Sequence, residues 1–292
     1  MSAPRLTVLA TGPLSTVQDA GRPGRAALGI GRSGACDRAS HRLANRLVGN
    51  AEDAATLEVT AGGLALSADT DLLVAVTGAR CAGPFPYAAP TLLRAGAELR
   101  LGPPVSGLRS YVAVRGGVDV APVLGSRSTD LLAGLGPAVL RAGDVLPVGR
   151  DSGSWPEVDV APVPEPAAGG LTVAVLPGPR ADWFTDTALA DLTGAPYGVT
   201  ADSNRVGLRL DGPVLQRRRD GELPSEGMVR GALQVPPSGL PVLFLADHPV
   251  TGGYPVIGYV ADADVDRCGQ LVPGQAVRFH PSPSQLSRVA GG

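Results

Sequence analysis

The 292-residue chain contains no lysine, and all 25 of its strongly basic residues are arginines. A Walker A phosphate-binding loop needs Gly-Lys followed by Ser or Thr, so this class of nucleotide site is excluded. A Schiff-base lysine is excluded too, and so is covalently attached biotin, because both need a lysine amine. Any anion that the chain binds must therefore be held by arginines, by backbone N–H groups or by a metal ion.

Aromatic residues, cysteines and long apolar runs are also scarce. Aromatics are 4% of the chain against 44% hydrophobic residues, so the core must consist mainly of Val, Leu and Ala. Cys36, Cys81 and Cys268 are too widely spaced for a metal pattern or a disulfide framework, and we expect no metal ligands. No segment approaches the roughly 20 apolar residues that span a bilayer. We expect a cytoplasmic protein without a membrane partner. The net charge of −2 also argues against a nucleic-acid partner.

Glycine and proline are abundant, with 40 and 28 residues, and they separate short apolar segments. This pattern is typical of short strands joined by tight turns. A turn with a glycine at its end, where φ > 0 is expected, precedes a predicted strand at 93–96, 140–143 and 271–274. We therefore predict a mostly β protein with a few helices, built from barrel or sandwich elements and not from a parallel α/β sheet.

Periodicity predicts two helices. One follows a cap at Asp37 or Ser40, runs to residue 48 and is ended by Gly49-Asn50. The other covers 181–192. The predicted strands are 57–59, 72–77, 97–101, 109–114, 144–148, 171–176, 241–246, 256–260 and 275–279.

Residues 151–170 are rich in Pro, acidic and small residues and lack core periodicity, which predicts a linker. The linker divides the chain into an N-terminal β-rich lobe, 1–150, and a C-terminal β-barrel lobe, 171–285. A tail, 286–292, follows the second lobe.

The N-terminal lobe carries two candidate polar loops. The first places an amide, a carboxylate and a guanidinium within five residues, as Gln18, Asp19 and Arg22. An Asx-turn with a surface ion pair is the alternative interpretation. In the second, Arg115 and Arg127 sit beside Gly and Ser residues, where they could clamp a carboxylate or phosphate, or alternatively bond to loop carbonyls.

The C-terminal lobe contains the most site-like stretch, which runs from Asp247 to Pro255 after an apolar strand. It combines acid, imidazole, hydroxyl and phenol groups with two glycines that let a substrate approach the backbone. His248 has the chemistry of a general acid or base, although a loop hydrogen bond would also explain it. Glu226 and Gln234 precede this stretch.

Several motifs, taken in order, resemble one family over nearly the whole chain. They include STVQDAGRPG, SGACDRASHRLANRLVGN, YVAVRGGVDVAPVLGSRST, LPSEGMVRGALQVPPSGLPVLFLAD and TGGYPVIGYV. The family is the biotin-dependent carboxyltransferase-like group, also known as allophanate hydrolase subunit 2 or the sporulation-kinase-inhibitor antagonist. In bacteria it supplies the C subunit of 5-oxoprolinase.

The resemblance implies a cyclophilin-like β-barrel architecture in two lobes. It also implies a subunit of an ATP- and Mg²⁺-dependent complex that hydrolyses the small molecule 5-oxoproline to glutamate. The partners would be a B-like subunit, in direct contact, and an A-like subunit, with a homo-oligomer or a B₂C₂ assembly possible. Two alternatives remain open. One is a carboxyltransferase that acts on urea or a related amide with biotin on a separate carrier. The other is a regulatory protein that antagonises a histidine-kinase inhibitor.

The resemblance also implies site residues. The catalytic candidates are Glu226, Asp247 and Tyr254. The substrate-binding candidates are Gln18, Asp19, Arg22, Arg115, Ser126, Arg127, Gln234, Thr251, Gly252 and Gly253. We further expect the 18–22 loop and the 251–255 loop to share a polar cleft.

Overall fold

A computed structural model describes residues 3–150 and 154–282 of the chain. Two compact units are present: unit 1 comprises residues 1–24 and 32–168, and unit 2 comprises residues 25–31 and 169–292. The predicted tail and residues 151–153 of the predicted linker lie outside the described residues. Each unit has its own hydrophobic core.

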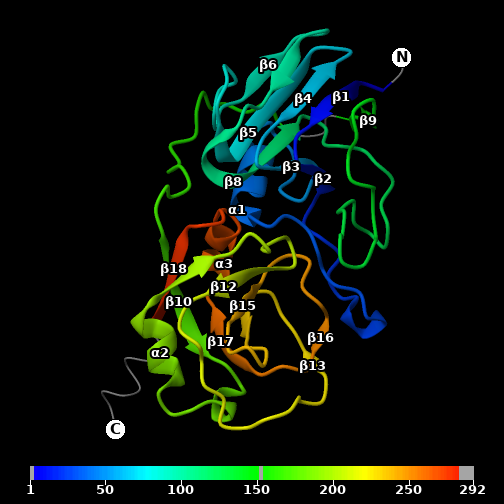
Figure 1. The fold of residues 1–292 in the computed structure, drawn as a ribbon. Coiled ribbons are helices and arrows are strands. Elements are labelled where there is room, and N and C mark those ends of the chain that lie inside the picture. Colours follow the sequence, from blue (N-terminus) through cyan, green and yellow to red (C-terminus); the bar gives the residue numbers. More distant parts are fainter. Residues whose placement is uncertain (1–2, 151–153, 283–292) are drawn as a thin grey trace. The chain divides into compact units, whose positions relative to one another are not determined.

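Unit 1 contains two antiparallel sheets, with strand orders β7-β4-β1-β9 and β2-β3-β8-β5-β6 (Figure 1). The strands are β1 (Arg5–Thr11), β2 (Leu14–Gln18), β3 (Thr56–Thr60), β4 (Leu64–Ala68), β5 (Leu72–Cys81), β6 (Thr91–Leu93), β7 (Glu98–Arg100), β8 (Pro104–Val114) and β9 (Val145–Pro147).

Strand β5 shows how the core of unit 1 is built. Successive side chains of a strand point to opposite faces of the sheet. Val74 and Val76 lie in a core cluster that draws residues from both sheets. Leu73 and Ala75 belong to a second cluster with helix α1 (Arg38–Leu47). Because both faces of the strand are covered here, residues 72–76 are continuously apolar and do not alternate with polar residues.

Unit 2 is a closed barrel with strand order β10-β17-β14-β15-β12-β11-β18. Strands β10 and β18 close it with a parallel pairing, and its other pairings are antiparallel. A two-stranded ribbon, β13 with β16, is separate from the barrel. The strands are β10 (Leu171–Pro177), β11 (Pro196–Val199), β12 (Gly207–Asp211), β13 (Glu226–Gly227), β14 (Ala232–Gln234), β15 (Val242–Phe244), β16 (Thr251–Gly252), β17 (Val256–Val260) and β18 (Ala276–Pro281).

The predicted mostly β fold with barrel elements is confirmed. The three turn glycines behave as expected, with φ of 77° at Gly96, 95° at Gly143 and 90° at Gly274. They lead into β7, β9 and β18. These conformations are local requirements of the backbone, which is why sequence alone identifies them.

The helix predictions divide into one success and one error. Helix α1 begins after Asp37 as predicted. The predicted helix 181–192 is wrong, because a 3₁₀ turn, η2 (Ala181–Trp183), and a short helix, α2 (Ala188–Gly194), replace it. Phe184 is extended, pairs with Arg217 and is 2% exposed, so its burial in the barrel core breaks the helix. Helix α3 (Asp262–Cys268) and the 3₁₀ turn η1 (Ala26–Leu28) were not predicted.

Candidate functional site

In unit 1 the loop that holds Asp19 and Arg22 lies against the loop that holds Arg127, and the carboxylate of Asp19 joins the two. This carboxylate accepts hydrogen bonds from the backbone N–H of Gly21 at 2.7 Å and of Arg127 at 2.5 Å. It also accepts from the hydroxyls of Ser126 at 2.7 Å and Ser128 at 2.5 Å. The side chain is 8% exposed. Asp19 therefore braces both loops, and its oxygens are already bonded within the protein.

Behind these loops, three buried side chains have unused hydrogen-bonding capacity. Arg22 is 1% exposed and donates from Nη2 to the Ser128 carbonyl at 2.5 Å, while its Nε and Nη1 have no hydrogen-bond partner. Gln18 donates from Nε2 to the Thr129 carbonyl at 2.9 Å, but its Oε1 is unpartnered, as is Oγ1 of Thr129.

Buried polar atoms in proteins are nearly always bonded, so an exception of this kind points to a binding site. Asp130 is the nearest counter-charge, with Oδ2 3.7 Å from Arg22 Nη1. We define Gln18, Arg22 and Thr129 as the unit 1 polar cluster. Thr129 was missed as a site residue, although its place in the Ser126–Asp130 loop beside Arg127 is the signal that could have found it.

The expected clamp of Arg115 and Arg127 is not supported by their contacts. Arg127 donates to Asp119 at 2.7 Å and to the Val120 carbonyl at 2.8 Å. Arg115 donates to the Val48 carbonyl at 2.9 Å, and its guanidinium stacks 5.0 Å from the Trp155 ring centroid. The alternative interpretation, arginines that bond to loop groups, describes both side chains.

A second buried polar network in unit 1 was not predicted from the residues alone. Glu58, on β3, is 1% exposed and accepts from the Tyr111 hydroxyl at 2.8 Å and from the Cys36 N–H at 2.9 Å. Burial and the Glu58 charge raise the pKa of Tyr111 well above its usual range, so the phenol stays protonated. This network joins β3, β8 and the residues that precede α1.

In unit 2 the predicted residue Glu226 lies on the β13–β16 ribbon, paired with Gly252. Both of its carboxylate oxygens are bonded to the guanidinium of Arg180, 3.1 Å from Nε to Oε2. The hydrogen bond from Arg180 lowers the pKa of Glu226, so this carboxyl group is ionised at neutral pH. An ionised carboxylate can orient a polar ligand, but it is a poor proton donor.

Five more of the predicted residues lie on this ribbon or next to it. Gln234 donates to the Tyr254 carbonyl at 3.3 Å. A Cβ on Gly252 would stand 2.5 Å from Gln234 Nε2, so a larger residue there would displace the Gln234 amide. Thr251 is exposed, and Gly253 and Tyr254 are half-buried. Glu226, Gln234 and Tyr254 thus gather around β13 and β16.

Asp247 and His248 do not belong to this group by their contacts. Asp247 is 2% exposed. Arg205 donates hydrogen bonds to both of its carboxylate oxygens, from Nε to Oδ2 at 2.9 Å and from Nη2 to Oδ1 at 3.0 Å. This buried pair favours a bracing role for Asp247 over the predicted catalytic one. His248 bonds through Nδ1 to the Pro249 carbonyl at 2.8 Å and stacks on Phe244, in accord with the loop hydrogen bond considered above.

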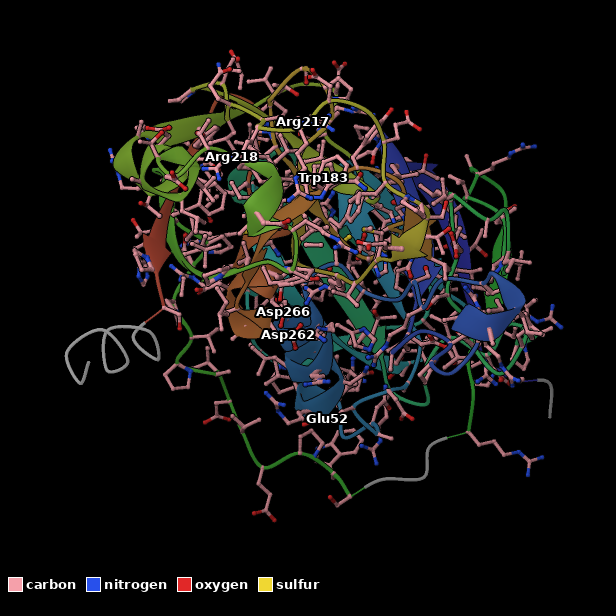
Figure 2. The ribbon with its side chains drawn as sticks, turned by 90° about the horizontal axis from the view of Figure 1, so that it is seen from below. Glu52, Trp183, Arg217, Arg218, Asp262 and Asp266 are labelled. Carbon is pink, nitrogen blue, oxygen red and sulfur yellow. The ribbon has the colours of Figure 1, made fainter. Side chains whose placement is uncertain are left out.

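The run of three arginines at 217–219 is engaged in local pairs. Arg217 lies over the ring of Trp183, 5.7 Å from its centroid (Figure 2). Arg218 pairs with Asp186 at 2.6 Å. Arg219 pairs with Asp182 at 3.1 Å.

In the part of the chain that the structure describes, no group of three or more His, Cys, Asp or Glu residues is placed to hold a metal ion. Across residues 3–150 and 154–282, no helix is long and apolar enough to cross a membrane.

Comparison with known proteins identifies the family to which this architecture belongs. The family model described as "Carboxyltransferase domain, subdomain A and B" matches residues 28–281, and the chain belongs to this family. The family resemblance inferred from the sequence is therefore confirmed.

Two curated relatives are C subunits of 5-oxoprolinase. The relative from Escherichia coli K12 is 38% identical over 282 residues, which cover 94% of this chain and 90% of the relative. The relative from Haemophilus influenzae is 33% identical, covering 91% of this chain and 87% of the relative.

Among solved structures, TTHA0988 is similar with a TM-score of 0.86 and 38% identity over 96% of this chain. The urea amidolyase of K. lactis is similar with a TM-score of 0.89 and 31% identity over 99% of this chain. The chain spans 56% of the TTHA0988 chain and 19% of the urea amidolyase chain. In both of these proteins the shared region is thus accompanied by further sequence.

Proposed function

We propose that this chain is the C subunit of a 5-oxoprolinase, acting with A-like and B-like subunits to hydrolyse 5-oxoproline to glutamate. The observation that carries this proposal is the 38% identity to the C subunit of the Escherichia coli 5-oxoprolinase across 94% of this chain and 90% of that relative. The match therefore extends over most of the length of both chains. We also expect a cytoplasmic location, as the sequence predicted.

The unit 1 polar cluster supports this substrate by its chemistry. 5-Oxoproline carries a carboxylate, a ring N–H donor and a ring carbonyl acceptor. Arg22 has unused Nε and Nη1 donors, Gln18 has an unused acceptor, and Thr129 has an unused hydroxyl. These groups match the three polar parts of the substrate one to one. Because they are buried, a substrate reaches them only when the residues that cover them move.

ATP and Mg²⁺ belong to the assembled complex in this proposal. The proposed partners are a B-like subunit in direct contact and an A-like subunit, in an assembly such as B₂C₂. In unit 2, Glu226, Gln234 and Tyr254 are retained as candidate site residues, with Glu226 in its ionised form.

The experiment is to mix the purified chain with A-like and B-like subunits and to measure ATP hydrolysis with and without 5-oxoproline. We expect stimulation by 5-oxoproline only in the complete mixture. Stable association of the subunits without such stimulation would refute the assignment. Arg22→Gln should then reduce kcat/KM about tenfold or more, because a charged hydrogen bond to the substrate is lost.

Thr129→Val is a milder test, since it removes one hydroxyl without changing the shape of the side chain. We expect a several-fold rise in KM with the circular dichroism spectrum unchanged. Arg94→Gln is the matched control, because Arg94 pairs with Asp71 at the surface, away from the cluster. Equal kinetics for all three variants would remove the polar cluster from the proposal but leave the subunit assignment in place.

Similarity to urea amidolyase favours one alternative, carboxyl transfer to urea from biotin on a separate carrier. It rests on the TM-score of 0.89 over 99% of this chain. Because this chain has no lysine for biotin attachment, a carrier protein must supply the cofactor. Urea-dependent loss of a carboxyl group from a carboxybiotinyl carrier, without any response to 5-oxoproline, would select this alternative.

A further inference from the structure

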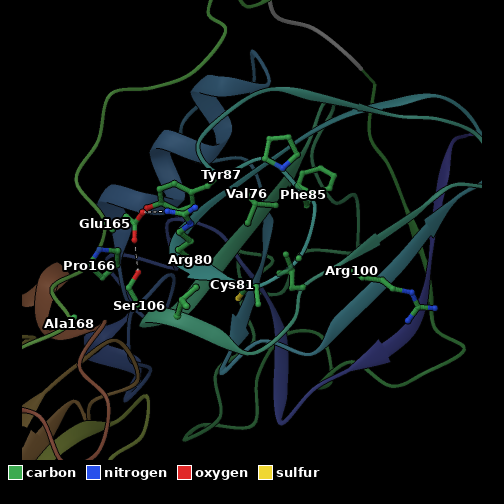
Figure 3. A pocket seen from close by; sticks show the side chains of 15 residues that line it. Val76, Arg80, Cys81, Phe85, Tyr87, Arg100, Ser106, Glu165, Pro166 and Ala168 are labelled. Atoms are coloured by element: carbon green, nitrogen blue, oxygen red, sulfur yellow. Dashed lines mark hydrogen bonds and ion pairs between the residues drawn. The ribbon is translucent and has the colours of Figure 1, made fainter.

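A pocket in unit 1 lies apart from the residues of the proposed function. Its volume is about 630 Å³, which is within the range of small-molecule sites. Its walls come from the end of β5, the following loop 82–87, the end of β7 and the start of β8 (Figure 3). Glu165, Pro166 and Ala168, from the segment predicted as a linker, complete the lining.

This segment is fastened to unit 1 at several points. We call residues 154–168 the strap. Arg115 donates to the Ser154 carbonyl at 3.0 Å, and Ala161 donates its N–H to the Ala88 carbonyl at 2.8 Å. At the pocket, the Glu165 side chain of the strap contacts Arg80 and Ser106 of unit 1. The strap therefore follows the surface of unit 1 and places one of its own carboxylates at the pocket.

The carboxylate of Glu165 is bound by two groups of the pocket. It forms an ion pair with Arg80 Nη1 and accepts a hydrogen bond from the Ser106 hydroxyl at 3.3 Å (Figure 3). An arginine beside a hydroxyl donor is a common arrangement for binding carboxylates. The side chains of Arg80 and Glu165 are 53% and 42% exposed. Exposed ion pairs of this kind contribute little to stability, so another carboxylate can displace Glu165 at small cost.

The rest of the pocket offers apolar surface next to this carboxylate position. Val76, Phe85 and Leu101 are among the lining residues, and Val105 is 68% exposed at its edge. Most ligand pockets combine such apolar walls with a few polar anchors. The apolar side chains suit an aromatic ring or a branched alkyl group.

We propose that this pocket binds a small organic carboxylate with an aromatic or branched apolar body, whose carboxylate replaces Glu165 on Arg80 and Ser106. The strap then acts as a built-in competitor, because its own carboxylate occupies the anchor when no ligand is bound. This site is independent of the unit 1 polar cluster and of the proposed hydrolase function.

The test uses 2-naphthoate, a fluorescent aromatic carboxylate, titrated into the full-length chain. Arg80→Gln should weaken binding about tenfold or more, since it removes the charged anchor. Glu165→Gln should strengthen binding several-fold, because it removes the competing carboxylate while keeping the shape of the side chain. Arg94→Gln, an exposed arginine outside the pocket, should leave the affinity unchanged.

Two results would overturn the proposal. One is equal affinity of the wild type, Arg80→Gln and Glu165→Gln for 2-naphthoate. The other is an absence of saturable binding to Glu165→Gln, in which the competing carboxylate has been removed. Neutral 2-naphthamide should bind more weakly than 2-naphthoate to the wild type and should be insensitive to Arg80→Gln.

Alkylation of Cys81 gives a second readout that locates the ligand. Cys81 lines the pocket, whereas Cys36 and Cys268 are fully buried and serve as internal controls. Burial raises the pKa of the Cys81 thiol, so the reaction with N-ethylmaleimide is followed at mildly alkaline pH. Saturating 2-naphthoate should slow the alkylation of Cys81. An unchanged rate would place the ligand elsewhere and refute the assignment.

Discussion

His41 illustrates how the fold changes the chemistry of a single residue. Its imidazole is buried, with Nδ1 2.9 Å from the Thr56 hydroxyl and Nε2 3.5 Å from the Asn45 amide nitrogen. Burial lowers the pKa of His41 to about 4, because the charged form loses its hydration. The negative charges of Asp19 and Glu58 act in the opposite direction but do not outweigh burial. The ring is therefore neutral in the folded protein at pH 7.

This pKa predicts a loss of stability in mild acid. Between pH 6.5 and about 4 the unfolded chain binds a proton at His41 that the folded chain does not, so the free energy of unfolding falls as pH decreases. The contribution should reach about 2 kcal/mol at about pH 5. Urea unfolding of the wild type and His41→Gln at about pH 7.5 and about pH 5 measures it. Parallel changes in the two proteins would show that His41 is not responsible.

At the scale of elements, α1 shows a helix whose start is specified locally. The Asp37 carboxylate accepts from the Ser40 N–H at 2.9 Å and from the Ser40 hydroxyl at 2.6 Å. At the other end Gly49 has φ of 72°, a conformation that glycine adopts easily. The helix covers β5 and β8 through Ala44 and Leu47. Its bounds follow from caps a few residues away, which explains the accuracy of the prediction.

Removal of the cap should destabilise unit 1 measurably. Asp37→Ala leaves the Ser40 N–H without its acceptor and should lower the free energy of unfolding by about 1–2 kcal/mol. Asp37→Asn keeps a capping oxygen and should lose much less. Urea denaturation followed by circular dichroism compares the two variants. If both variants lose the same amount, the carboxylate acts through something other than the cap.

At the scale of the whole molecule, each unit is organised around a separate core. The barrel core contains Leu208, Leu233 and Leu243 among its fully or nearly fully buried residues. The main core of unit 1 is built from other residues, such as Leu57 and Leu66. A change in one core should therefore act mainly on its own unit.

Leu243→Ala tests this separation. A leucine to alanine change at a fully buried site usually costs about 2–5 kcal/mol, and Leu243 is 0% exposed. Amide hydrogen exchange should accelerate in the strands of the barrel and stay nearly unchanged in β1 to β9. Leu57→Ala is the reciprocal control and should show the opposite pattern. Equal acceleration in both units would mean that they unfold as one cooperative body.

The candidate site could be foreseen only in part. Gln18 and Arg22 could be predicted from the sequence because polar residues are concentrated beside glycines in one loop. It did not reveal that Arg22 is buried with unused donors, or that Thr129 lies beside it. Those facts depend on contacts between residues that are far apart in the sequence. The hydrogen bond from Gln18 to the Thr129 carbonyl, for example, joins residues 111 positions apart.

Local geometry is what the sequence by itself determined about this protein. Turns at Gly96 and Gly143 and the start of α1 depend on backbone conformations and caps within a few residues, and the absence of lysine is a fact of composition. The tertiary structure alone decided what each carboxylate does. Asp19 braces two loops, Asp247 is paired with a buried arginine, and Glu165 lies at a pocket. The physical reason is that burial and partners, which set the charge and reactivity of a side chain, come from distant segments.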